Sequence, residues 1–327
     1  MESIANKILT VSIAAYNVEE YLDETLTSCI PAIRNLDVIV VNDGSKDGTL
    51  EVAKKWESRY PDSIRVVDKP NGGYGSTMNT SIPLARGAYF RYLDGDDWFE
   101  PNQLADYVQV LSERTEDVVV TPYRRVYESG AQPETKDCLD YLGEGSFEAT
   151  VLNPNKPIAA SAIAYKTELL RSSSFNMTEG CFYTDIEYAY LPMRRASTIY
   201  VSHIPIYQYR IGREGQSVSV KGIQRHYSDL LRVCKRLLRE ISSFEGDSSA
   251  YLQGCLIKEC CLAYRYTCIA GPDNHIKQEL RDFDEYVRET SSITYNRMAS
   301  SSRLVLLLRN TGFLLWKPVC RLVKRRL

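Results

Sequence analysis

Three carboxylates crowd the end of one apolar run in this sequence. In YFRYLDGDDWFEP (89–101), Asp94, Asp96 and Asp97 follow strand-forming residues directly. Left unpaired there, they would repel one another and resist desolvation. Gly95 lets the backbone turn so that the first two converge, and Mg²⁺ and Mn²⁺ prefer such oxygen ligands together with substrate phosphates. We therefore expect a divalent cation at Asp94 and Asp96, and keep as the alternative a solvated turn that leads into a helix.

Two loops rich in glycine and polar residues precede this cluster. In VVNDGSKDGT, Asp43 ends an apolar run and could accept hydrogen bonds from a nucleotide base, although the composition also suits an ordinary turn. In NGGYGSTMN, glycines open a predicted helix. They do not fit G-x-G-x-x-G and no P-loop lysine follows, so the loop is a weak nucleotide signal, and a tight connection is the better explanation of the loop taken alone.

Two later segments carry charges suited to chemistry or to an anionic ligand. TEGCFYTDIEYAY places Asp185 and Glu187 at a helix start, where they could act chemically or complement the helix dipole. YQYRIGREGQSVS offers Arg210, Arg213 and small hydroxyls, which suit an anionic group but also a surface hairpin.

The elements that must position these residues alternate between strand and helix. Apolar runs predict strands over 8–15, 36–42, 63–68, 88–93 and 116–122, with helical spacing between them. That order predicts an α/β fold with a parallel, doubly wound sheet. The loops after the strands then share one edge, where open α/β sheets bind ligands.

The rest of the chain divides less regularly. Short strands are predicted over 123–127 and 158–165, a helix up to Pro192, and a strand over 198–212; from 221 to about 290 the pattern is helical. We expect a first domain over 1–220, a helical C-terminal region over 221–300, and a basic amphipathic tail over 301–327.

Composition is that of an ordinary globular protein. Of 327 residues, 44% are apolar and 25% charged, and the net charge of −2 does not indicate nucleic-acid binding. Nine cysteines without a Cys-x-x-Cys pair, and only three histidines, argue against a disulfide framework or structural zinc. We expect a cytoplasmic protein without a signal peptide or transmembrane helix.

The tail, SSRLVLLLRNTGFLLWKPVCRLVKRRL, has two apolar blocks and a basic end. From Thr290 onward there is no acidic residue, while the basic residues are Arg297, Arg303, Arg309, Lys317, Arg321, Lys324, Arg325 and Arg326. Such a segment suits the surface of an anionic membrane, here the inner face of the cell membrane. The alternative is a C-terminal helix packed on the domain with a solvated basic end.

Five motifs together resemble the family 2 glycosyltransferases of the GT-A fold. They are VSIAAYNVEEYLDETLTS, VVNDGSKDGT, KPNGGYGSTMNTSIPLARGAYFRYLDGDDW, EGCFYTDIEY and YRIGREGQSVS, and they cover about residues 7–220. The resemblance implies transfer of a sugar from a nucleotide-diphosphate sugar, with inversion at the anomeric carbon. The implied acceptor is a hydroxyl of a cell-surface glycan or of its lipid-linked precursor.

The family's functional positions carry over residue by residue. The metal-binding D-x-D matches Asp94-Gly95-Asp96, the acid that binds uracil matches Asp43, and the acceptor's general base matches Asp185. Many members have Glu-Asp at that last position, where this chain has Thr184 before the aspartate. The remaining expected nucleotide-sugar contacts are Ala15, Tyr16, Asn17, Glu19, Gly72, Gly73, Asn79, Arg210, Gln216 and Ser217.

One departure and two other functions have to be weighed. Many members carry Arg before the residue matching Asn79, and this chain has Met78, so arginines elsewhere, such as Arg125 or Arg210, would help neutralise the diphosphate. A sugar-1-phosphate nucleotidyltransferase would need a basic, glycine-rich loop after the first strand, and AAYNVEEYLDE is neither. A catalytically silent glycan-binding relative is the other alternative, and the intact set of acids argues against it.

Overall fold

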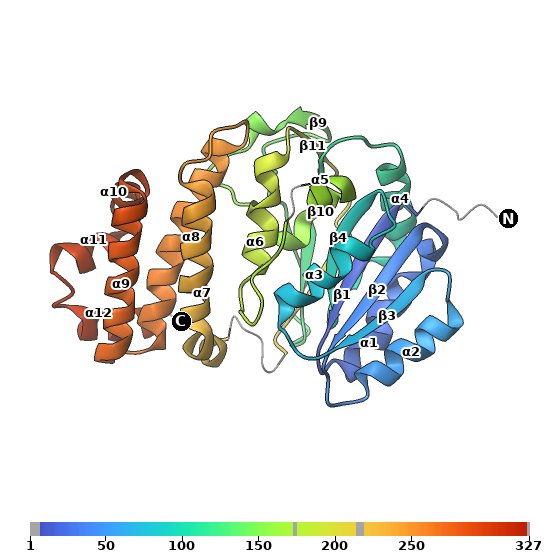
Figure 1. The fold of residues 1–327 in the computed structure, drawn as a ribbon, viewed down its shortest axis with the longest axis horizontal. Coiled ribbons are helices and arrows are strands. Elements are labelled where there is room, and N and C mark those ends of the chain that lie inside the picture. The colour runs from blue at the N-terminus through green and yellow to red at the C-terminus, as the bar shows by residue number, and fades with distance from the viewer. Residues whose placement is uncertain (1–6, 173–174, 214–218, 326–327) are drawn as a thin grey trace. The chain divides into compact units, whose positions relative to one another are not determined.

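A computed structural model describes residues 7–172, 175–213 and 219–325. The chain forms two units (Figure 1). The sheet unit comprises Met1–Val151 and Ile158–Arg213, and the helical unit comprises Leu152–Pro157 and Glu214–Leu327. The division into a catalytic domain, a helical region and a tail stays a prediction.

The sheet unit alternates strands and helices. Its strands are β1 (Leu9–Ala15), β2 (Leu36–Asp43), β3 (Ile64–Lys69), β4 (Tyr89–Asp94), β5 (Trp98–Phe99), β6 (Val118–Val120), β7 (Tyr123–Tyr127), β8 (Glu134–Lys136), β9 (Gly145–Glu148), β10 (Ile163–Lys166), β11 (Thr198–Val201) and β12 (Tyr207–Ile211). Its α-helices are α1 (Glu19–Ser28), α2 (Thr49–Arg59), α3 (Tyr74–Leu84), α4 (Pro101–Ser112), α5 (Thr167–Ser172) and α6 (Asp185–Tyr190). Helix α1 packs on α2, and α3 lies against β1 and β2 (Figure 1).

The central sheet confirms the predicted α/β class. Within the part of the chain that the structure describes, eight strands follow the order β3-β2-β1-β4-β10-β6-β11-β9. Strands β1 to β4 are parallel to one another, as the alternation predicts. The strand predicted over 116–122 is the shorter β6, and β10 lies between it and β4, antiparallel to both. Alternation identifies strands, but it does not say which of them become neighbours.

The strand predicted over 198–212 is two strands in different sheets. β11 joins the central sheet, whereas β12 belongs to a second sheet with the order β5-β12-β7-β8. Pro205 lies between them and has no N–H to donate to a ladder, which favours a break there. Because β12 pairs with β5, which directly follows the acidic turn, this break brings residues 207–211 to that turn.

The parallel strands end at one edge, as expected from their direction. The register aligns Ala15 with Asn42, Ala14 with Asp94, and Asp43 with Lys69. β2 is buried along its whole length, which explains why its sequence is continuous rather than alternating. The loops after β1, β2, β3 and β4 therefore meet at one side of the sheet.

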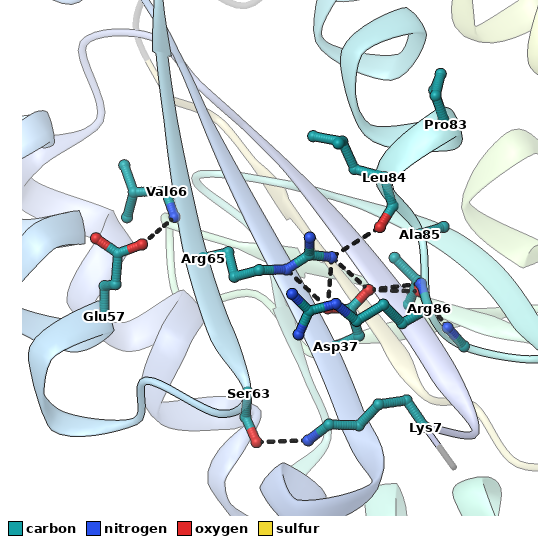
Figure 2. Close-up of polar contacts among 12 residues, drawn as sticks. Lys7, Asp37, Glu57, Ser63, Arg65, Val66, Pro83, Leu84, Ala85 and Arg86 are labelled. Carbon is teal, nitrogen blue, oxygen red and sulfur yellow. Dashed lines mark hydrogen bonds and ion pairs between the residues drawn. The ribbon is translucent and has the colours of Figure 1, made fainter. Parts of the chain in front are cut away.

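The opposite ends of these strands are held together by one buried carboxylate (Figure 2). Asp37 accepts hydrogen bonds from Arg65 Nη2 at 2.7 Å, Thr10 Oγ1 at 3.0 Å and the Arg86 amide at 2.9 Å. Thr10 Oγ1 in turn accepts the amide of Gly87 at 2.8 Å. A side chain at Gly87 would collide with the Thr10 amide, which requires glycine where the chain enters β4. The cluster thus fixes β1, β2, β3 and the start of β4.

Asp37→Ala should lower the free energy of unfolding by about 3 kcal/mol, because it leaves the half-buried Arg65 guanidinium, the Arg86 amide and the Thr10 hydroxyl without this buried acceptor. The decrease is measured by urea denaturation, with the exposed Asp62→Ala as a matched control whose expected change is within about 0.5 kcal/mol. Equal stability of the two variants would contradict the role of this cluster.

The helical unit consists of α7 (Val220–Ile241), α8 (Ser249–Ala270), α9 (Asn274–Thr290), α10 (Ser292–Ser301), α11 (Arg303–Asn310) and α12 (Trp316–Lys324). The helical pattern predicted over 221–290 is therefore three helices. The break after α8 falls at Gly271 and Pro272. Among the residues described, no helix is both long and apolar enough to cross a membrane.

Candidate functional site

The acidic turn at the end of β4 approaches β1 so closely at Gly95 that a side chain there would collide with it. The Gly95 amide donates to the Ala14 carbonyl at 3.1 Å, and a Cβ there would lie 2.8 Å from that same oxygen. On the other side, Thr25 Oγ1 contacts the Gly95 and Asp97 carbonyls at 3.1 and 2.7 Å. The turn is thus fastened to β1 and α1, and the positions of its carboxylates follow from that.

Asp97 is the buried anchor of the turn. Its carboxylate accepts hydrogen bonds from the Tyr207 hydroxyl at 2.6 Å and from the Arg210 amide at 2.8 Å. Burial, followed by the charges of Asp94 and Asp96, raises its pKa. Asp97 therefore fastens β12 to the turn and has little capacity left for a ligand.

Asp94 and Asp96 are half-buried and lack a comparable set of donors. Asp94 Oδ2 lies 3.2 Å from the hydroxyl of Tyr207, whose single proton is closer to Asp97. The surrounding protein, then Asp96 and Asp185, raises the pKa of Asp94. Asp96 Oδ2 forms an ion pair with Arg213 Nη1 at 2.7 Å. The raised pKa shows that the ionised form of Asp94 lacks stabilisation, which a bound cation would supply.

This pair of carboxylates suits a divalent cation whose other ligands come from a substrate. Within the described ranges, no three His, Cys, Asp or Glu side chains gather closely enough to hold a metal by themselves. Mg²⁺ and Mn²⁺ are commonly held by one or two carboxylates, with phosphates and water completing the shell. The donor chemistry of Asp94 and Asp96 fits that arrangement.

Asp185 begins α6 and contributes to the same electrostatic environment. Its side chain is exposed, yet the protein packed around it raises its pKa, and hydrogen bonds from its own amide and that of Ile186 oppose this in part. Its charge also raises the pKa of Asp94. The structure thus brings Asp185 near the acidic turn, although the two are about 90 residues apart in sequence.

The segment before α6 is hydrogen-bonded to the glycine loop (71–75) and to α3, which follows it. Asn79 uses both ends of its amide: Nδ2 donates to the Met177 carbonyl at 2.9 Å, and Oδ1 accepts the Met177 amide at 2.7 Å. The Gly180 amide donates to the Gly72 carbonyl at 2.7 Å. Buried Glu187 accepts the amide and hydroxyl of Thr178, both at 2.7 Å. Asn79 and Glu187 therefore act here as positioning residues for the approach to Asp185.

Asp43 holds the glycine loop. Its carboxylate accepts the amides of Gly72 and Gly73 at 2.9 and 2.8 Å, and Lys69 Nζ lies 2.8 Å from it. Gly73 has a φ of 79°, a left-handed conformation that favours glycine. Both carboxylate oxygens are thus engaged with the loop, so the predicted contact to a base would share them with these amides.

The loops after β1 and β2 are bound to each other. Asn17 Oδ1 accepts the Lys46 amide at 2.8 Å, and Glu19 Oε2 accepts the Gly48 amide at 2.7 Å. In the loop after β1, Ala15 is buried and Tyr16 is exposed. Of the contacts predicted here, Tyr16 has the most accessible side chain, while Asn17 and Glu19 set the shape of the loops.

Arg210 lies against the acidic turn. Its Nε donates to the Asp96 carbonyl at 2.8 Å, its Nη2 pairs with Glu24 at 2.6 Å, and its guanidinium stacks on Trp98 and Tyr21.

The other predicted phosphate-side residues fall in different places. Arg125 is half-buried on β7, and its buried Nε has no hydrogen-bond partner among the residues that the structure describes. Met78 is fully buried, so it offers nothing to a diphosphate. Gln216 and Ser217 lie outside the described residues.

Sequence reasoning missed two tyrosines of β12. Tyr207 is buried and joins Asp94 to Asp97, and the pKa of half-buried Tyr209 is raised by burial and then by these carboxylates. Their spacing of two places both on one face of the strand. The pattern YQYRI contains that signal, but only the pairing of β12 with β5 shows that this face meets the acidic turn.

Tyr207→Phe should weaken Mn²⁺-dependent binding of a nucleotide-diphosphate sugar by roughly tenfold, because it leaves buried Asp97 without its hydroxyl donor. Calorimetric titration measures this effect. Tyr165→Phe is the matched control, since that buried hydroxyl donates instead to the Ala189 carbonyl at 2.9 Å. If both variants bind like the wild type, Tyr207 does not position the turn.

The sequence of this chain is similar to those of known glycosyltransferases. A family model described as glycosyl transferase family 2 matches residues 10–170. The chondroitin synthase of Pasteurella multocida is 34% identical over 126 residues, which are 38% of this chain and 13% of that protein. EpsH of Bacillus subtilis, named as a glycosyltransferase, is 23% identical over 339 residues, covering 98% of this chain and 85% of its own length. The chain thus spans a small part of the first relative and most of the second.

Solved structures show the same fold. Residues 1–349 of S. aureus TarS, in complex with UDP-GlcNAc, superpose with a TM-score of 0.68 at 17% identity, covering 97% of this chain and 90% of that one. The mannosyltransferase PcManGT of Pyrobaculum calidifontis, in complex with GDP-Man and Mn²⁺, has a TM-score of 0.54 at 16% identity, with 98% and 84% covered. Both likenesses extend over nearly the whole chain.

Proposed function

This chain belongs to glycosyl transferase family 2, and on that premise we propose that it moves a sugar from a UDP-sugar to a hydroxyl group, with inversion at the anomeric carbon. The proposed acceptor is a cell-surface glycan or its lipid-linked precursor, reached from the cytoplasm. The observation that carries the proposal is the convergence of Asp96 and Asp185 on Asp94 at the ligand edge of the sheet, where both charges raise the pKa of Asp94. The complexes of TarS with UDP-GlcNAc and of PcManGT with GDP-Man support a nucleotide sugar as donor.

Asp185 is the proposed general base. It takes the proton of the acceptor hydroxyl as that oxygen attacks the anomeric carbon from the face opposite the diphosphate. The raised pKa of its carboxyl suits this role, because a more basic carboxylate accepts a proton more readily near neutral pH. Its exposed side chain leaves room for an acceptor.

Asp94 and Asp96 are the proposed ligands of Mn²⁺ or Mg²⁺. When bound, such an ion stabilises the negative charge of the departing nucleoside diphosphate. Tyr207 contacts the carboxylates of Asp94 and Asp97 and so holds the turn that carries the two ligands, and Gly95 allows the turn to approach β1 closely.

Arg213 and the glycine loop complete the proposed donor site. Arg213 neutralises Asp96 in this structure, and its guanidinium is a cation suited to a diphosphate beside that residue. Asp43 keeps the amides of Gly72 and Gly73 in a fixed conformation. In this proposal, Arg213 supplies the positive charge that an arginine at position 78 would otherwise supply.

Differential scanning fluorimetry against a panel of nucleotide sugars, with and without Mn²⁺, tests the donor. We expect UDP-sugars to raise the melting temperature more in the presence of Mn²⁺, and sustained UDP release to require both donor and acceptor. Pyrophosphate formation from a sugar phosphate and UTP would identify a nucleotidyltransferase instead. Donor binding without turnover on any acceptor would favour a catalytically silent relative.

A further inference from the structure

Helices α11 and α12 and the turn between them expose five leucines. Leu314 is 83% exposed and Leu322 50%, while Leu306, Leu307 and Leu315 are 41% to 43% exposed. The same helices bury a second apolar set, Val305, Leu308, Trp316 and Val319. A helix that only covers a core needs a single apolar face, so the outer leucines are left without a role in folding.

The exposed residues have helical spacing. In α11, Arg303, Leu306, Leu307 and Asn310 follow the i, i+3, i+4, i+7 pattern of one helix face. Around α12, Leu315, Pro318, Leu322 and Arg325 are exposed at spacings of three and four. Both helices pack on α8 (Figure 1). Each one therefore combines an inner face on the helical unit with an outer face that mixes leucine and arginine.

This outer surface is held in place by specific polar contacts. Arg309, at the end of α11, donates from Nε to Asp284 at 2.7 Å and from Nη1 to the Tyr295 carbonyl at 2.6 Å. Arg281 donates to the Gly312 carbonyl at 2.7 Å, in the turn between α11 and α12. The leucines project from a folded platform, and Arg309 itself is committed to that platform.

The positive charge of this surface indicates what kind of partner it can bind. The cations exposed beside the leucines are Arg303, Lys317, Arg321 and Arg325, and the sequence has no acidic residue after Thr290. A second copy of the chain would bring the same cations face to face across a symmetric interface, which is repulsive. An anionic lipid surface instead accepts leucines among its acyl chains and pairs its phosphates with the cations.

We propose that the leucine–arginine surface, formed by Leu306, Leu307, Leu314, Leu315 and Leu322 with Arg303, Lys317, Arg321 and Arg325, binds the interface of an anionic phospholipid bilayer. The helices lie on the bilayer and do not cross it. This binding needs neither a donor nor an acceptor sugar, so its test does not depend on whether the proposed reaction is correct.

Vesicle flotation of the full chain tests this surface. The probes are vesicles of phosphatidylcholine with 30% phosphatidylglycerol (about one anionic lipid in three, to supply phosphate partners) and vesicles of phosphatidylcholine alone. We expect the wild type to float with the anionic vesicles and to be released by high salt. Leu314→Ser/Leu315→Ser and Arg321→Gln/Arg325→Gln should each lower the partition coefficient at least tenfold. The exposed Ile293→Ser in α10 is the matched control and should float like the wild type.

Three outcomes would overturn the proposal: a wild type that stays with the soluble protein, equal flotation of all variants, or equal flotation with neutral vesicles. Light scattering measures the molar mass of each variant and so tests the other occupant, a second copy of the chain. If the leucine variant turns a dimer into a monomer and no form binds vesicles, the surface is an interface between two copies. Unchanged melting temperatures of the variants show that any loss of binding does not reflect unfolding.

Discussion

Asp185→Asn should abolish most turnover, lowering kcat by roughly 10²- to 10⁴-fold, the range typical of a lost general base. Affinity for the donor should stay within about twofold of the wild type, because the proposed role of Asp185 concerns the acceptor. Steady-state kinetics of UDP release and calorimetric titration of the donor measure the two quantities separately. Asp106→Asn is the matched control, since that aspartate is exposed on α4, away from the acidic turn.

The pH dependence gives an independent readout of the same residue. The pKa of Asp185 is raised by its surroundings, and only the ionised carboxylate accepts a proton. Activity of the wild type should therefore fall as pH decreases through that raised pKa, above the usual range of aspartate. At saturating Mn²⁺ and donor, where Asp94 is already engaged as a proposed ligand, the residual activity of Asp185→Asn should lack this acidic limb. Wild-type kcat in the variant, or an unchanged pH profile, would reject the assignment.

Asp96→Ala should remove the Mn²⁺-dependent part of donor affinity, a loss of roughly tenfold to a hundredfold if the ion and its contacts contribute a few kcal/mol. The ion pair with Arg213 gives Asp96 a structural role as well. A structural role alone would weaken binding equally with and without Mn²⁺, whereas a ligand role confines the loss to the titration that contains the metal.

Glu24→Gln is the control for this variant. Glu24 pairs with Arg210 beside the same turn, so the substitution removes a nearby negative charge without removing a proposed ligand. We expect its donor affinity to keep its dependence on Mn²⁺. Calorimetric affinity of Asp96→Ala equal to that of the wild type in Mn²⁺ would contradict the metal role.

The sequence predicts the parts of the site that depend on local pattern. The apolar run that ends at Asp94 places the acidic turn at a strand terminus, and the register with β1 and β2 puts it at the predicted edge. The α/β class follows from the alternation of strands and helices in the same way. These features require only that neighbours in sequence determine the element and its direction.

Contacts between distant segments were beyond that reasoning. Tyr207 meets Asp97 across 110 residues and Arg213 meets Asp96 across 117, and both pairs depend on β12 leaving the central sheet to join β5. The insertion of β10 beside β4 is likewise a matter of long-range pairing.

Asp43 shows a different limit of sequence reasoning. Its place at the end of β2 was predictable from the sequence. The hydrogen bonds that the amides of Gly72 and Gly73 donate to its carboxylate were not. The identity of a site residue can thus be inferred from the pattern, while its partners require the tertiary structure.

The central claim is that Asp94 and Asp96 hold a divalent ion that also contacts the diphosphate of the donor. Anomalous diffraction from crystals soaked with UDP and Mn²⁺ tests it most directly. The account predicts an anomalous peak beside the Asp94 and Asp96 carboxylates, with the phosphates of UDP as its other ligands. A peak elsewhere, or UDP bound away from this turn without a metal beside either aspartate, would contradict it.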